Sequence, residues 1–138
     1  MLLLERTISI IKPDINEIQL VKKIMGMLEK KGLKIVKIMI TKLTIKQAKK
    51  FYQEHKKQEF FEEMIKFMCS SPIVVMLLEG NDAIKINREI IGATDPRKAK
   101  RGTIRKIYGK SIEKNAIHGS DSLKAAKREI DFFSILLE

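Results

Sequence analysis

The order in which strand-like and helix-like segments follow one another constrains the fold of this chain more than any other feature. Four apolar segments, at residues 6–13, 33–44, 72–80 and 115–118, predict β-strands. The first two alternate apolar and polar residues, as half-buried strands do, and the first ends at Pro13. The third, PIVVMLLEG, is continuously apolar, which is typical of a central strand.

Amphipathic helices are predicted between and after these strands, at residues 18–32, 45–56, 59–71, 83–91 and 120–133. Thr44 and Asp82 are the expected N-caps of the second and fourth helices, since both side chains offer an oxygen to free backbone N–H groups. Gly92 is expected to end the fourth helix, and Ser120 or Ser122 to cap the last one.

This order predicts an α+β sandwich with a ferredoxin-like βαββαβ core, in which helices cover a four-stranded antiparallel sheet. The whole chain, residues 1–138, is expected to form a single domain. Residues 93–114 are basic and only weakly periodic, and they predict a long loop before the last strand. A loop longer than ~15 residues within a compact domain is usually functional.

Composition favours a globular protein of the cytoplasm. Hydrophobic residues make up 44% of the chain and charged residues 33%. No apolar run approaches the ~18 residues of a membrane span, and the N-terminal MLLL is followed at once by Glu5 and Arg6, unlike a signal peptide. The single cysteine, Cys69, has no partner for an internal disulfide.

The net charge of +11 indicates a polyanionic partner such as nucleotide phosphate, nucleic acid or a membrane surface. The lysines are scattered along the chain, however, so solvated lysines on helix faces explain the charge about as well. An RNA-binding module of ferredoxin-like fold without catalysis is therefore an alternative. Such a module needs aromatic residues on its sheet, and segments 6–13 and 72–80 contain none.

One of the two histidines, His118, lies in the segment NAIHGSDS (115–122), directly after the long loop. A metal site is disfavoured because no other His or Cys repeats a ligand spacing, and no G-x-S-x-G marks a serine hydrolase. GKS at residues 109–111 resembles the end of a P-loop, but Ile104 stands where the leading glycine belongs. A nucleophilic or a structural histidine remains.

Three features favour a nucleophile. Gly119 leaves room beside the ring, and Glu129 lies on one stripe of the last helix that faces back toward the strand, where a carboxylate could hold one ring nitrogen. Candidate phosphate-binding side chains lie upstream: Lys12, Arg88, Thr94 and Arg105. These residues favour a phosphohistidine mechanism.

NAIHGSDS resembles the N-x-x-H-G-S-D signature of the nucleoside diphosphate kinase family. The similarity extends along nearly the whole chain, in family order: TISIIKPD, FYQEH, FFEEMIKFMCSSPIVVMLLEG, NREIIGATDPRKAKRGTIR and REIDFF. The resemblance implies transfer of the γ-phosphate of a nucleoside triphosphate to His118 and then to a nucleoside diphosphate. It also implies a cytoplasmic homo-oligomer, a dimer-based tetramer or hexamer, and Mg²⁺ that is held largely by the nucleotide phosphates.

The resemblance implies a role for each motif residue. His118 would attack through Nδ1, and Glu129, helped by Ser120, would hold its ring. The other residues would surround the nucleotide: Lys12 and Asn115 at the sugar and the transferred phosphate, Tyr52 at the histidine pocket, Arg88, Thr94 and Arg105 at the phosphates, and Phe60 and Ile112 on the two faces of the base. Because stacking needs only the face of a base, broad base specificity is expected.

Adjacent helix positions cannot both face the core, so Phe61 is expected in the core and Phe60 at the base. The chain departs from the family pattern at several positions. In the loop, Arg101 replaces a proline and Lys106 begins a KIY stretch in place of a more acidic one. These changes make the loop more basic. A phosphate-sensing protein with an inactive site is a further alternative, which the presence of every proposed catalytic residue argues against.

Overall fold

The computed structural model describes residues 4–136. Residues 1–3, which include most of the MLLL segment, and residues 137–138 lie outside this range. The strands are β1 (Leu4–Ile11), β2 (Lys34–Thr41), β3 (Ile73–Asn81) and β4 (Ile117–Gly119). The α-helices are α1 (Ile18–Lys30), α2 (Ile45–Phe51), α3 (Phe61–Met68), α4 (Ala83–Ile91), α5 (Ile104–Tyr108) and α6 (Leu123–Leu136), with a 3₁₀ turn at Gln53–His55.

The four strands form one antiparallel sheet in the order β2-β3-β1-β4. Chain neighbours β1 and β2 are therefore separated by β3, which is the ferredoxin-like arrangement that the order of elements predicted. β1 pairs with β3 along its whole length, from Leu4 opposite Asn81 to Ile11 opposite Val74. Its other edge pairs with the three residues of β4.

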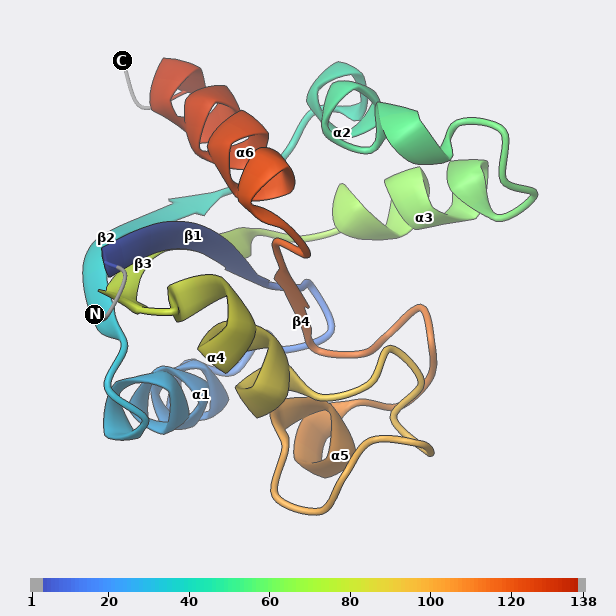
Figure 1. Ribbon diagram of the computed structural model, residues 1–138. Helices are drawn as coiled ribbons and strands as arrows, with labels where there is room; N and C mark the ends of the chain where they lie inside the picture. Colours follow the sequence, from blue (N-terminus) through green and yellow to red (C-terminus); the bar gives the residue numbers. More distant parts are fainter. Residues whose placement is uncertain (1–3, 137–138) are drawn as a thin grey trace.

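Helices cover both faces of the sheet (Figure 1). On one face α1 and α4 pack over a core that includes Ile11, Met76 and Leu78. On the other face α2, α3 and α6 pack over a second core that includes Ile8 and Ile10. The alternation of β1 explains this division, because neighbouring side chains of a strand point to opposite faces.

Two local predictions differ from the structure, and the structure decides between the two cap residues predicted for the last helix. Asp82 precedes α4 as expected, but its φ of 52° is left-handed and its side chain makes no capping hydrogen bond. The predicted loop at 93–114 contains the short helix α5, whose first turn is capped by the hydroxyl of Thr103. Ser122, and not Ser120, is the serine that accepts a hydrogen bond from the first turn of α6, from the N–H of Ala125 at 3.0 Å.

Within residues 4–136, no helix combines the length and the apolarity needed to cross a membrane.

Candidate active site

β4 places His118 directly opposite Ile10 of β1. Directly opposed residues of antiparallel strands point to the same face of the sheet, so the His118 side chain lies, like Ile10, on the side covered by α2, α3 and α6. Its side chain is 22% exposed, which leaves part of the ring open to a ligand.

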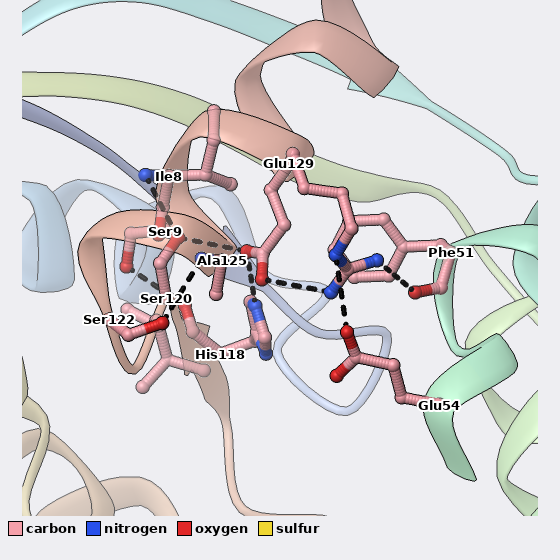
Figure 2. Close-up of polar contacts among 12 residues, drawn as sticks. Ile8, Ser9, Phe51, Glu54, His118, Ser120, Ser122, Ala125 and Glu129 are labelled. Atoms are coloured by element: carbon pink, nitrogen blue, oxygen red, sulfur yellow. Dashed lines mark hydrogen bonds and ion pairs between the residues drawn. The ribbon is translucent and has the colours of Figure 1, made fainter.

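Glu129 of α6 holds the His118 ring from within the protein. Its Oε1 lies 2.8 Å from Nε2 of His118 and accepts a hydrogen bond of 2.9 Å from the hydroxyl of Ser120 (Figure 2). An ionised carboxylate can only accept, so Nε2–H donates and the lone pair of the neutral ring is on Nδ1. The arrangement therefore orients the imidazole and leaves Nδ1 as its free nucleophilic atom.

Two aromatic side chains of the α2 segment pack around the same ring. Phe51 and Tyr52 meet His118 edge to face, with ring centroids 5.6 and 6.3 Å away. Burial raises the pKa of the Tyr52 hydroxyl far above its ordinary value, with a smaller contribution from Glu129. That hydroxyl has no hydrogen-bond partner among the described residues, so it is free to donate to a ligand beside His118.

Three cations from separate parts of the chain lie around the histidine. Arg88 of α4 donates to the carbonyl of Gly119 at 3.4 Å, and Lys12, just after β1, reaches the carbonyl of Glu113 at 3.5 Å. Arg105 of α5 donates to the carbonyls of Gly92 and Ile117 at 3.1 and 2.8 Å.

Burial and mutual repulsion alter the ionisation of two of these cations. The pKa of Lys12 falls to about 8, mainly through burial and then through the charge of Arg105. Burial, with the nearby Arg88, lowers the pKa of Arg105 to about 10. Cations that disfavour each other's charged form in this way are stabilised when an anion such as a phosphate binds between them.

Ten of the eleven predicted site residues line one cleft of about 540 Å³. They are Lys12, Tyr52, Phe60, Arg88, Thr94, Arg105, Ile112, Asn115, His118 and Glu129. Ser120 is fully buried behind Glu129. The volume is in the range of pockets that bind small molecules and cofactors.

Asn115, just before β4, joins the loop to the site. Its side-chain amide donates to the carbonyl of Thr94 at 3.0 Å, while its Oδ1 is buried without a partner among the described residues. Apolar side chains lie farther out: Phe60 and Ile112 line the same cleft and are 51% and 56% exposed, whereas Phe61 is only 7% exposed. Phe61 therefore lies in the core, as predicted, and Phe60 lies at the cleft.

The role predicted for Gly119 needs correction. A Cβ at this position would lie 2.6 Å from Nδ2 of Asn87 and 2.6 Å from Cδ1 of Ile91, both on α4. The missing side chain thus makes room for the close packing of α4 against β4, while the backbone of Gly119 itself lines the cleft.

Sequence reasoning missed two residues that hold the site. Asp14 accepts a hydrogen bond of 3.0 Å from the N–H of Ala116, whose φ of 76° is unusual for alanine, and so fixes the turn into β4. Arg128 of α6 lies beside Glu129 and donates a hydrogen bond to the main-chain carbonyl of Phe51, at the end of α2. Both contacts join residues that are distant in the chain, and no local sequence pattern indicates them.

Comparisons with known proteins point to the same family over nearly the whole chain. The family model described as nucleoside diphosphate kinase matches residues 5–135. The nucleoside diphosphate kinase of Anaeromyxobacter dehalogenans (strain 2CP-C) is 53% identical over 130 residues, which cover 94% of this chain and 88% of the relative. That of Helicobacter pylori (strain Shi470) is 48% identical over 129 residues, 94% of each chain.

Solved structures agree as well. The crystal structure of the Aquifex aeolicus nucleoside diphosphate kinase superposes with a TM-score of 0.91 at 42% identity and covers 95% of both chains. That from Encephalitozoon cuniculi has a TM-score of 0.90 at 37% identity, over 94% of this chain and 88% of the other. Sequence, fold and cleft lead to one conclusion: the chain belongs to the nucleoside diphosphate kinase family.

Proposed function

We propose that this nucleoside diphosphate kinase transfers phosphate in two steps through His118. In the first step Nδ1 attacks the γ-phosphorus of a nucleoside triphosphate. The N–P bond forms, the bond to the β-γ bridging oxygen breaks, and the diphosphate leaves with the electron pair. In the second step a terminal phosphate oxygen of another nucleoside diphosphate attacks the phosphohistidine and restores the free ring.

The contact between Nε2 of His118 and Oε1 of Glu129, at 2.8 Å, is the observation that carries this proposal. When Nδ1 becomes bonded to phosphorus, the ring gains positive charge, which the adjacent carboxylate stabilises. Ser120 keeps the same carboxylate oxygen in place. Lys12, Arg88 and Arg105 are positioned to neutralise the charge of the transferring phosphate, since all three line the cleft with His118.

The outer part of the cleft supports recognition of a base by stacking. Phe60 and Ile112 offer exposed apolar surface in the cleft, and Asn115 and Lys12, which line the same cleft, would contact the sugar and the transferred phosphate in the proposed binding mode. Stacking on a phenyl ring accepts purines and pyrimidines alike. We therefore expect ATP and other nucleoside tri- and diphosphates to be substrates.

The residues present fit Mg²⁺ that arrives with the nucleotide. The cleft offers cations to the phosphates, and residues 4–136 contain no group of three or more His, Cys, Asp or Glu side chains arranged to hold a metal. Phosphate oxygens and water suit Mg²⁺ as ligands without a protein cage. When bound, the ion would neutralise part of the phosphate charge.

The remaining expectations follow from family membership. We propose that residues 1–138 form one catalytic domain that works in the cytoplasm as a homo-oligomer, a dimer-based tetramer or hexamer; light scattering would determine its size. Nucleic acid is not required for the reaction. The RNA-binding alternative is disfavoured because none of the four strands in the described chain carries Phe, Tyr or Trp.

Intact mass spectrometry after incubation with ATP and Mg²⁺ tests the mechanism. The protein should gain one acid-labile phosphoryl group, and initial-rate lines at varied donor and acceptor should be parallel. His118→Ala should lose the phosphoryl group and at least ~10³-fold in turnover, because no neighbouring group replaces the nucleophile. His55→Ala, on the exposed 3₁₀ turn, should stay within a few-fold, because His55 lines the cleft but has no part in the proposed transfer. Equal behaviour of the two variants, or intersecting lines, would contradict the mechanism.

A further inference from the structure

Arg128, the residue before Glu129 on α6, contacts three different groups. Its Nη1 donates to the main-chain carbonyl of Phe51 at 3.1 Å. Its Nη2 lies 3.7 Å from Oε2 of Glu129, and its Nε lies 3.5 Å from Oε1 of Glu54. Each guanidinium nitrogen thus faces a different partner. Nη1 faces the end of α2, Nη2 faces α6 itself, and Nε faces the 3₁₀ turn.

The contact with Glu129 bears on the orientation of a buried carboxylate. The Glu129 side chain is only 3% exposed, and its Oε1 already serves both His118 and Ser120. The terminal torsion of a glutamate is broad and roughly two-fold, so bonds to one oxygen leave the plane of the carboxylate poorly defined. A cation 3.7 Å from Oε2 forms an ion pair that favours one direction of the second oxygen, and it supplies counter-charge to a group that is costly to bury alone.

The contact with Phe51 reaches a second neighbour of the histidine. The guanidinium carbon of Arg128 lies 6.0 Å from the centroid of the Phe51 ring, and that ring meets His118 edge to face. Arg128 therefore holds both the carboxylate behind the imidazole and the aromatic ring beside it. The contact with Glu54 contributes less, because that carboxylate is 64% exposed.

We propose that Arg128 is a positioning residue for phosphotransfer, which acts through Glu129 to hold the His118 ring with Nδ1 free for attack. The inference rests on the roles proposed above for His118 and Glu129. Arg128 does not itself take part in bond formation. Its planar fork reaches the carboxylate and the Phe51 carbonyl at the same time, which the point charge of a lysine does less well.

The test uses the full-length protein and three variants. Arg128→Met keeps an unbranched apolar stem and removes the charge and the fork, and Arg128→Lys keeps the charge alone. Lys127→Met is the matched control, since Lys127 is exposed on the same helix and does not line the cleft. For each protein, the rate of His118 phosphorylation is measured in single turnovers at varied ATP concentrations.

We expect Arg128→Met to lower the maximal rate of phosphorylation by about 10- to 100-fold, the range known for side chains that orient the ligands of metal sites. The half-saturating ATP concentration should change by less than about threefold, because the lost effect belongs to the transition state. Arg128→Lys should recover part of the rate, and Lys127→Met should match the unmodified protein. An unchanged maximal rate in Arg128→Met, or a raised half-saturating concentration alone, would overturn the proposal.

A spectroscopic measurement separates positioning from mere loss of stability. In ¹⁵N NMR spectra of the folded, nucleotide-free protein, His118 should show one tautomer, with hydrogen on Nε2, and His55 serves as the internal reference. Arg128→Met should show a mixture of tautomers at His118 only. A lower melting temperature with the tautomer preserved would make Arg128 a purely structural residue. If the unmodified protein formed no phosphohistidine, the proposed function itself would fail, whatever the variants did.

Discussion

Phe60 and Phe61 are adjacent in the chain but occupy opposite environments, one half exposed at the cleft and the other buried against the sheet. Phe60→Ala should weaken the binding of purine and pyrimidine nucleotides by about 1–3 kcal/mol, the range for base–aromatic stacking. Because the base is bound equally in ground and transition states, the loss should appear in KM more than in kcat. Steady-state kinetics with ADP and CDP as acceptors would measure it.

Phe61→Ala provides the comparison at the neighbouring position. Removal of this buried ring should lower the free energy of unfolding by ~3–5 kcal/mol, as large-to-small changes in cores do. Chemical denaturation of both variants would measure how much each substitution lowers the free energy of unfolding. A Phe61 variant that loses nucleotide affinity, beside a Phe60 variant that loses stability, would mean that the stacking residue is wrongly assigned.

Lys12 should make nucleotide binding sensitive to pH. Burial and Arg105 hold its pKa at about 8 in the free protein, so it is protonated below that pH and loses its charge above it. A bound phosphate favours the protonated form, and binding above the pKa must therefore take up a proton. Affinity for ADP should fall by up to about tenfold per pH unit above about pH 8.

Calorimetric titration of ADP between about pH 7.5 and pH 9.5 would measure this dependence. Lys12→Met should bind more weakly near pH 7.5 and show a flatter profile. A fall of equal steepness in that variant would assign the pH dependence to another group.

At the scale of elements, α2 brings Phe51 and Tyr52 to the histidine, and its start is stabilised by a capping box. The Thr44 hydroxyl accepts from the N–H of Gln47 at 3.1 Å, and the Gln47 side chain accepts from the N–H of Thr44 at 3.0 Å. Thr44→Ala should lower the free energy of unfolding by about 1 kcal/mol. Urea denaturation would measure the loss, Thr44→Ser should restore most of it, and an undiminished stability would show that the cap contributes nothing.

The long elements followed from sequence pattern, and so did the short strand β4, which was predicted at residues 115–118, whereas the short helix α5 did not. β1, β3 and α1 span enough residues for alternation or helical periodicity to be evident. Helix α5 has five residues, fewer than two turns, so Ile104 and Ile107 could not establish a period within a basic segment. Asp82 has the side chain of a good cap, but its backbone is left-handed, which the sequence does not specify, and the side chain makes no capping hydrogen bond to α4.

At the scale of the whole molecule, the cleft is built from parts of the chain that lie far apart in sequence. Lys12 follows the first strand, Tyr52 and Phe60 flank the 3₁₀ turn, and His118 lies on the last strand. The resemblance of the motifs identified these residues, because short family motifs preserve residue identity. Packing contacts such as that of Arg128 with Phe51 join residues 77 positions apart and depend on the folded arrangement alone.

The central place of β1 has a consequence for synthesis of the chain on the ribosome. β1 leaves the ribosome first, but its two pairing partners are β3, which ends at Asn81, and β4, which begins at Ile117. One edge of β1 therefore stays unpaired until the last quarter of the protein has been synthesised. An unpaired strand edge can pair wrongly with other chains. A nascent chain that is halted before β4 should thus be prone to aggregate and unable to bind nucleotide, although most of its residues are already made.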